Sequence, residues 1–235
     1  TYEELAYDSH FMPPSKKIHA VPLSLHINRN IPMEELEFYR QCIDVGCRDV
    51  HTKEKLTQLG VNSYLTGCLT LTFSRRTPEQ ERKADKIYLI DVQPDFKKLI
   101  PKEILENAIE LSSIYRFKIN HNSNRMTEDE ARYYHKMGED RIELLRNTAK
   151  LVITSRLHAA SPCLAMGIPV IMTKHDDRFG FIDRFLKAYT DWDTDCINWN
   201  PQPIDIEYEK NIIKQHFFSR VKYEANKINL NAKIG

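Results

Sequence analysis

The chain has 235 residues, enough to bury a hydrophobic core without disulfide or metal cross-links, so small stapled scaffolds are excluded. Its 34 Lys and Arg residues nearly balance 33 Asp and Glu residues, which argues against nucleic acid or an anionic membrane as a partner. The hydrophobic fraction is 41%, and no apolar run approaches the roughly 18 residues of a membrane span. We therefore expect a soluble globular protein with no integral membrane segment.

The cysteine pattern indicates reduced thiols. The five cysteines are scattered, with no Cys-x-x-Cys pair and no histidine at zinc-finger spacing, so neither a disulfide framework nor a structural metal is predicted. A cytoplasmic protein fits this pattern best. Because the sequence starts at Thr1 instead of Met, we also expect an N-terminal piece of the natural protein to be missing.

The first part of the chain predicts alternating strands and helices. β-Branched and leucine-rich runs bounded by polar residues indicate strands, and Pro32 followed by two glutamates suits a first helical turn. The predicted elements are, in order, a strand over 18–27, a helix from Pro32, a strand over 45–48, a helix from Thr52 to Gly60, and one or two short strands over 61–73.

Residues 74–86 are strongly polar and predict an inter-domain linker, with the pair Arg75 and Arg76 in solvent. Beyond it, Thr127 and Glu130 form a helix capping box, and Gly167 marks a helix end. The elements predicted there are strands over 87–92, 114–119, 151–155 and 168–172, and helices over 101–111, 127–150, 157–166 and 205–228.

This alternation predicts an α/β fold with mainly parallel sheets, in which ligands bind at the carboxyl ends of the strands. The predicted domains are 1–74 and 85–204, and the segment 205–235 is expected to be a helix that packs back across them.

The turn Ser155-Arg156-Leu157-His158 carries the strongest chemical signal. It joins a predicted buried strand to a helix, and helix N-termini favour anions. Arg156 adds a planar fork for a carboxylate or phosphate, and His158 can move a proton near neutral pH. The alternative to a functional site is purely structural: Arg156 would form a surface ion pair and His158 would lie in the core.

Two blocks of the sequence resemble the polysaccharide pyruvyl transferase family. One is LVITSRLHAASPCLAMGIPVI, over 151–171, and the other is VGCRDVHTKEKLTQLGVNSYLTGCLTLTF, over 45–73. The resemblance implies two Rossmann-like halves facing across a cleft, as in GT-B glycosyltransferases. The chain departs from the family in having a short N-terminal half without a glycine-rich turn, which leaves acceptor binding and activity open.

The resemblance implies transfer of the enolpyruvyl group of phosphoenolpyruvate to two hydroxyls of a cell-surface saccharide, giving a pyruvate ketal. The donor carries a carboxylate and a phosphate, so two cationic elements are expected. Arg156 with its helix N-terminus is one, and by resemblance Arg48 from the other domain is the second. His158 is expected to be the proton donor, with Ser155 and Leu157 beside it, and no metal or cofactor is required. A lipid-linked acceptor would bring this enzyme to the membrane.

Weaker candidates follow other predicted strands. Substrate binding is predicted for Arg178, His121 and Asn122, and a solvated turn or loop is the alternative for Arg178 and His121. His26 and Asn28 close the first predicted strand and are expected, on position alone, to line the acceptor side. Asp191, Asp193 and Asp195 form the Asp-x-Asp pattern of metal-dependent glycosyltransferases, but the pattern arises easily by chance and follows a helix near the C-terminus.

Three functions therefore stay open. The first is pyruvyl transfer, the second is a GT-B-type glycosyltransferase that uses a nucleotide sugar, and the third is a degenerate homologue that binds saccharides.

Overall fold

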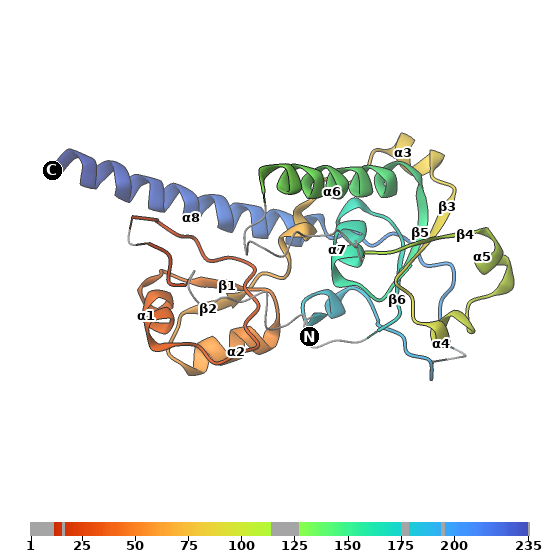
Figure 1. Cartoon of the computed structure of the whole chain (residues 1–235), viewed down its shortest axis with the longest axis horizontal. Helices are drawn as coiled ribbons and strands as arrows, with labels where there is room; N and C mark the ends of the chain where they lie inside the picture. The colour runs from red at the N-terminus through yellow and green to blue at the C-terminus, as the bar shows by residue number, and fades with distance from the viewer. Residues whose placement is uncertain (1–11, 16, 114–126, 175–178, 194–195, 235) are drawn as a thin grey trace. The chain divides into compact units, whose positions relative to one another are not determined.

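The computed structural model describes residues 12–15, 17–113, 127–174, 179–193 and 196–234, with side chains up to residue 228. The chain divides into two compact units (Figure 1). The first unit comprises Thr1–Leu69, Asp176–Phe181 and Tyr208–Gly235, and the second comprises Thr70–His175 and Ile182–Glu207.

The first unit contains a two-stranded parallel sheet. Strand β1 (Val45–Cys47) pairs with β2 (Ser63–Leu65), and helices α1 (Met33–Gln41) and α2 (Val50–Gln58) precede and follow β1. The long helix α8 (Glu207–Ile234) belongs to this unit from Tyr208 onward. The core of the unit is formed by Ile27, Leu36, Tyr39, Val45, Cys47, Leu56 and Val61.

The helix ends of the first unit follow the local sequence. Helix α1 begins after Pro32 as predicted, with Glu34 and Glu35 in its first turn. Helix α2 begins earlier than the predicted Thr52, because the Asp49 side chain accepts a hydrogen bond from the Thr52 backbone N–H and so caps the helix at Asp49. Past its end, Gly60 adopts a φ of +78°, which favours glycine.

The predicted strand over 18–27 is wrong: within it only Leu25 forms a single β-bridge, with Cys47. Ser24 has a φ of +59°, which interrupts an extended strand. The segment still lies against β1, since the Leu25 N–H donates to the Gly46 carbonyl at 3.0 Å and the Arg48 N–H donates to the Leu25 carbonyl at 2.7 Å. A Cβ at Gly46 would lie 2.6 Å from Leu23 Cδ1, so this approach requires glycine.

The second unit contains a four-stranded, all-parallel sheet in the order β4-β3-β5-β6. Its strands are β3 (Lys86–Ile90), β4 (Ala108–Leu111), β5 (Ala149–Thr154) and β6 (Val170–Met172). The helices are α3 (Pro78–Lys83), α4 (Pro94–Lys97), α5 (Lys102–Asn107), α6 (Glu128–Thr148) and α7 (Leu157–Met166), and short 3₁₀ turns lie at Leu69–Thr72 and Ile182–Arg184. The α/β fold with parallel sheets is therefore confirmed.

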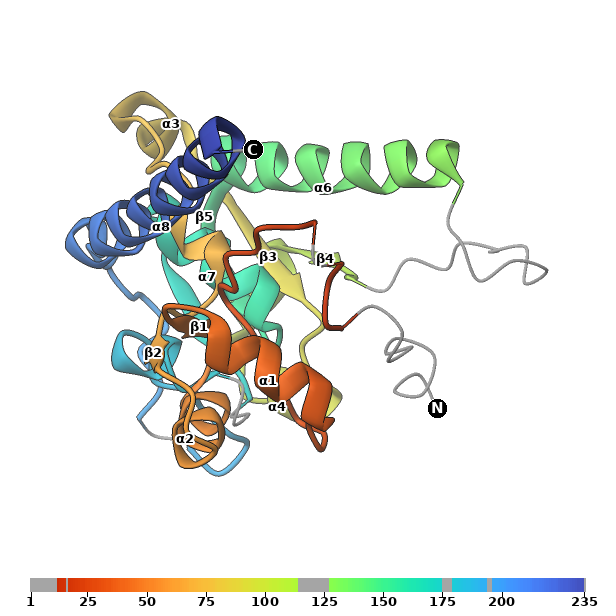
Figure 2. The ribbon, with the colours of Figure 1, turned by 90° about the vertical axis from the view of Figure 1, so that its left-hand side faces the viewer.

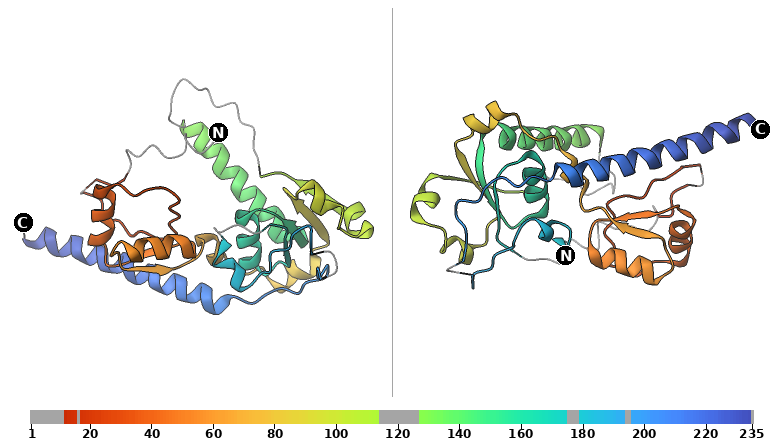
Figure 3. Two further views of the ribbon diagram at one scale, coloured as in Figure 1. Left: turned by 90° about the horizontal axis from the view of Figure 1, so that it is seen from below. Right: turned by 180° about the vertical axis from the view of Figure 1, so that it is seen from behind.

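Helices cover both faces of this sheet. Helices α6 and α7 lie on one face and α4 and α5 on the other, while α3 packs against α6 (Figures 1, 2 and 3). This distribution follows from right-handed crossovers, because the connection from β3 to β4 runs in the opposite direction to those from β4 to β5 and from β5 to β6. One apolar cluster joins Leu89, Ile153 and Ile171 of the strands to Phe96 and Ile100.

Several predicted elements of the second unit are correct. The Thr127 and Glu130 capping box begins α6, and Gly167, with a φ of +71°, ends α7. Strands β5 and β6 and helix α7 lie where predicted.

Others are wrong. The helix predicted over 101–111 ends at Asn107, because Ala108–Leu111 pairs with Ile87–Ile90 as β4. The strand predicted over 114–119 lies outside the described residues.

The polar segment 74–86 contains α3 and falls within the second unit. Thr77 and Gln80 form a capping box there. Arg76 is buried, contrary to the prediction, and its Nη1 donates to the Ala149 carbonyl at 2.6 Å. In the described part of the chain, no helix has an apolar stretch long enough to cross a bilayer.

Candidate active site

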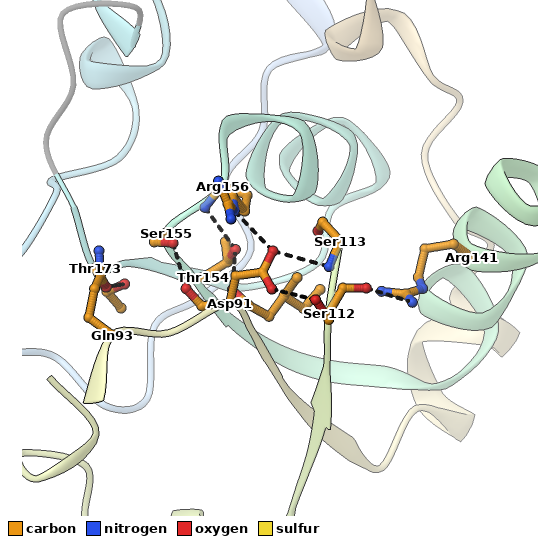
Figure 4. Close-up of polar contacts among 10 residues, drawn as sticks. Asp91, Gln93, Ser112, Ser113, Arg141, Thr154, Ser155, Arg156 and Thr173 are labelled. Carbon is orange, nitrogen blue, oxygen red and sulfur yellow. Dashed lines mark hydrogen bonds and ion pairs between the residues drawn. The ribbon is translucent and has the colours of Figure 1, made fainter. Parts of the chain in front are cut away.

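The richest polar cluster of the second unit lies at the carboxyl ends of β3, β4 and β5 (Figure 4). The chain leaves β3 toward β4 on one side and continues from β5 to β6 on the other. The carboxyl ends of the neighbouring strands β3 and β5 therefore form a topological switch point, the position at which open parallel sheets bind their ligands. Asp91 follows β3, and Ser155 and Arg156 follow β5, so polar residues line both sides of this point.

Asp91 is the centre of the cluster. Its carboxylate accepts hydrogen bonds from Arg156 Nε at 2.9 Å, the Ser112 hydroxyl at 3.0 Å and the Ser113 backbone N–H at 3.1 Å. The Ser155 hydroxyl donates to the Asp91 carbonyl at 2.6 Å. These bonds join the ends of three strands, so the position of Arg156 depends on β3 and β4 as well as on β5.

The conformation and charge of Asp91 are both unusual. Its φ of +49° lies in the left-handed region, which costs a non-glycine residue about 1 kcal/mol or more and is often found at functional sites. Burial alone would raise the pKa of Asp91, but the Ser113 N–H, the Arg156 guanidinium and the Ser112 hydroxyl together hold that pKa below its usual range. The Asp91 side chain therefore stays ionised beside Arg156.

Arg156 has part of its guanidinium available to a ligand. Its side chain is 47% exposed, and only Nε has a hydrogen-bond partner among the described residues. Its two terminal nitrogens therefore present the fork that binds a carboxylate or phosphate in two hydrogen bonds. The predicted surface ion pair does form, but it fixes the side chain by Nε alone.

The N-terminus of α7 adds backbone donors. Arg156 is the N-cap residue, and its side chain does not cap the helix. The first turn bonds from Ala159 and Ala160 back to Arg156, so the N–H groups of Leu157 and His158 have no partner among the described residues. Together with the ten-residue helix dipole, these two groups favour an anion.

His158 is exposed in the first turn of α7, contrary to the alternative of a core position. Neither ring nitrogen has a hydrogen-bond partner within the described chain, so the side chain is available to a ligand bound at this helix end. Ser155 and Leu157 flank Arg156; the Ser155 hydroxyl is bound to Asp91, and Leu157 contributes its N–H.

The other predicted residues belong to the first unit or are not among the described residues. Arg48 follows β1 in the first unit and is half-buried, with a buried Nε that lacks a hydrogen-bond partner among the described residues. His121, Asn122 and Arg178 lie outside the described residues, and their roles stay predictions.

The Asp-x-Asp pattern has a structural explanation at Asp193. Its carboxylate accepts hydrogen bonds from the Thr190 N–H at 2.8 Å and from Lys187 Nζ at 3.2 Å, and these donors lower the pKa of Asp193. Asp195 lies outside the described residues. Among the residues that are described, no group of three or more His, Cys, Asp or Glu side chains could hold a metal ion.

Asp91, Ser112 and Ser113 were not predicted as site residues. The predicted strand over 87–92 ran through Asp91, although a charged residue after four apolar ones marks a strand end. Ser112 and Ser113 were not recognised as following a strand, because the residues of β4 were predicted to be the end of a helix.

Comparison with known proteins agrees with the resemblance noted in the sequence. The family model described as polysaccharide pyruvyl transferase matches residues 11–177, which is more than two thirds of the chain. The match includes both sequence blocks and the turn that carries Arg156 and His158. Searches of curated proteins and of solved structures found no match. On the extent of the family match, the chain belongs to the polysaccharide pyruvyl transferase family.

Proposed function

We propose that this protein transfers the pyruvyl group of phosphoenolpyruvate to two hydroxyls of one saccharide, forming a cyclic ketal and releasing phosphate. The family supports a pyruvyl transferase with a saccharide acceptor. The observation that supports the donor assignment is that Arg156, whose terminal nitrogens have no partner among the described residues, is also the N-cap of α7, whose Leu157 and His158 N–H groups have none there either.

The donor suits these groups. Phosphoenolpyruvate carries two anionic groups on a three-carbon frame, and a guanidinium fork and a helix N-terminus each bind such a group. Asp91 balances part of the positive charge of Arg156 and binds only its Nε, so the terminal nitrogens have no partner among the described residues. As predicted from the resemblance, we propose that Arg48 also binds the donor.

The chemistry needs a proton at carbon before carbon–oxygen bonds form. His158 protonates the methylene carbon of the donor, so that C2 becomes electrophilic, and a saccharide hydroxyl adds to C2 with loss of its proton. The second hydroxyl then adds as the C2–O bond to phosphate breaks, and its proton is also lost. The products are the ketal, whose methyl group holds the added proton, and phosphate. This sequence requires no metal or redox cofactor.

The test is phosphate release from phosphoenolpyruvate in the presence of a panel of monosaccharides and short oligosaccharides. His158→Ala should lower the rate at least about 100-fold, as expected for a lost general acid. Arg156→Ala and Arg48→Ala should mainly weaken donor binding, measured by calorimetry. Matched controls come from exposed α6, where His135→Ala and Arg132→Ala remove the same residue types from surface ion pairs.

The alternatives give different results. Thermal stabilisation by a nucleotide sugar, with none by phosphoenolpyruvate, would indicate a glycosyltransferase and overturn the proposal. No response to either ligand would indicate a saccharide-binding homologue. Full transferase activity in the His158 and Arg156 variants would refute the site.

A further inference from the structure

A second polar arrangement, within the first unit, pairs a histidine with a buried aspartate. His26 Nδ1 lies 2.8 Å from Asp49 Oδ2, next to the end of β1. We infer that His26 is the proton acceptor for a saccharide hydroxyl and that Asp49 positions it. This inference rests on the proposed function, which supplies the hydroxyl that must lose its proton.

The contacts of Asp49 determine which nitrogen of His26 carries a proton. The residue is fully buried; Oδ1 accepts the Thr52 N–H at 2.8 Å, and Oδ2 lies 3.1 Å from the Thr52 hydroxyl. A carboxylate used in this way as the N-cap of α2 can only accept hydrogen bonds, so His26 Nδ1 donates to it. The lone pair of the neutral ring is then on Nε2, which is the atom that can accept a proton.

Nε2 is available to a ligand. The His26 side chain keeps 15% of its exposure, and Nε2 has no partner among the described residues. The backbone holds the ring in place from both sides, because the Ile27 N–H donates to the Thr52 hydroxyl at 3.0 Å and the Leu25 carbonyl accepts the Arg48 N–H at 2.7 Å. A fixed ring with one occupied and one open nitrogen is the arrangement of a general base.

Arg48 provides a second sign of a ligand at this strand end. Its Nε is buried and lacks a hydrogen-bond partner within the described chain, which is costly for a charged group. Leu25 directly precedes His26 in the chain, and its backbone bond to Arg48 brings the Arg48 backbone close to His26. A polar ligand at the end of β1 would meet both the guanidinium and the imidazole.

In the reaction, a saccharide hydroxyl oxygen forms its bond to C2 while its O–H bond breaks and the proton moves to Nε2. The buried carboxylate stabilises the imidazolium that results. The proton later passes to the released phosphate or to water, and the ring returns to its neutral form.

The decisive variants keep the size of each side chain. His26→Gln should lower kcat for pyruvyl transfer at least about 100-fold while the affinity for phosphoenolpyruvate stays within twofold. The matched control is His216→Gln, because His216 also pairs with an aspartate of the first unit, Asp44, at 3.2 Å. It should retain activity.

Asp49→Asn separates positioning from stability. Asparagine is as good an N-cap as aspartate, so the melting temperature should change little. Its amide group would donate to Nδ1 and place the ring proton on Nε2, so kcat should fall about as far as in His26→Gln. A purely structural role for the pair would not produce that separation.

Chemical rescue completes the test. Free imidazole should restore part of the activity of His26→Ala and none of that of His158→Ala. If wild-type protein transfers pyruvyl groups and His26→Gln or Asp49→Asn retains full kcat, the inference is wrong and the proposed function stands. If wild-type protein shows no transfer with any acceptor, the proposed function itself fails.

Discussion

Replacing Asp91 by asparagine or alanine would separate the charge of this residue from its hydrogen bonds. Asparagine tolerates the left-handed φ of +49° and can turn its oxygen toward Ser113 and Arg156 and its amide toward the Ser112 hydroxyl. All three hydrogen bonds can then persist, and only the charge is lost. Alanine loses the three bonds and tolerates this backbone conformation poorly.

The expected magnitudes follow from those differences. A charge-assisted hydrogen bond contributes about 1 kcal/mol more than a neutral one, and the half-exposure of Arg156 reduces this gain, so Asp91→Asn should lower the free energy of unfolding by less than about 1 kcal/mol. For Asp91→Ala, three lost bonds at about 1 kcal/mol each should lower it by about 3 kcal/mol. Because Asp91→Asn leaves Arg156 in place, it should also retain donor binding better than Asp91→Ala.

The pH dependence gives the sign of the effect. The pKa of Asp91 is lowered in the folded protein, so its carboxylate contributes stability that is fully present above about pH 4, where aspartate ionises in the unfolded chain. That stability is lost as the pH falls through the lower folded pKa. The difference between wild type and Asp91→Asn should therefore shrink in acid.

Urea unfolding followed by tryptophan fluorescence measures both effects. Trp199 packs against Phe96, with ring centroids 6.1 Å apart, and reports on the core of the second unit, whereas Trp192 is 88% exposed. A Trp192→Phe background removes the exposed signal. An Asp91→Ala variant as stable as wild type, or an Asp91→Asn difference that persists unchanged well below pH 4, would refute this account of the cluster.

Two further predictions concern the cores. Gly46→Ala should lower the free energy of unfolding of the first unit by about 2 kcal/mol or more, because the new Cβ would overlap Leu23. Urea unfolding followed by circular dichroism measures this change. An unchanged stability would contradict the close approach of Leu23 to Gly46. A thiol reagent at pH 8 should label Cys196 first, because Cys196 is exposed, whereas burial raises the pKa of Cys47 and Cys163 to about 12. Mass spectrometry identifies the labelled cysteines. Equally rapid labelling of Cys163 would contradict the buried position of α7.

Local sequence predicted the elements with strong periodicity or clear end signals. The Thr127 capping box, the apolar run of β5 and Gly167 each determine structure within a few residues, and each prediction is confirmed. The wrong predictions are at positions where distant partners decide. Residues 108–111 suit a helix as well as a strand, and they become β4 because an open edge of β3 lies beside them.

The candidate site was predictable only in part for the same reason. Arg156 and His158 are adjacent to a strand end and a helix start, so local sequence places them. Asp91 lies 65 residues before Arg156, and its role depends on β3 and β5 being neighbours in the sheet. His26 was noted for its position alone, because its link to Asp49 depends on the backbone contacts of residues 22–25 with β1.

The two strand-to-helix turns differ in the side chain at the N-cap of the helix. At α2, the Asp49 carboxylate accepts the Thr52 N–H and places a negative charge at the positive end of the helix, which disfavours a phosphate there. Asp49 instead supplies a negative partner for an imidazole. At α7, the side chain of the N-cap residue Arg156 accepts no hydrogen bond, so the Leu157 and His158 N–H groups have no partner among the described residues, and the guanidinium adds to their positive potential. If the donor binds here as proposed, Arg156→Asp should abolish its binding, measured by calorimetry with phosphoenolpyruvate, because a carboxylate at the N-cap would accept the helix N–H groups itself, whereas Arg156→Ala should only weaken binding.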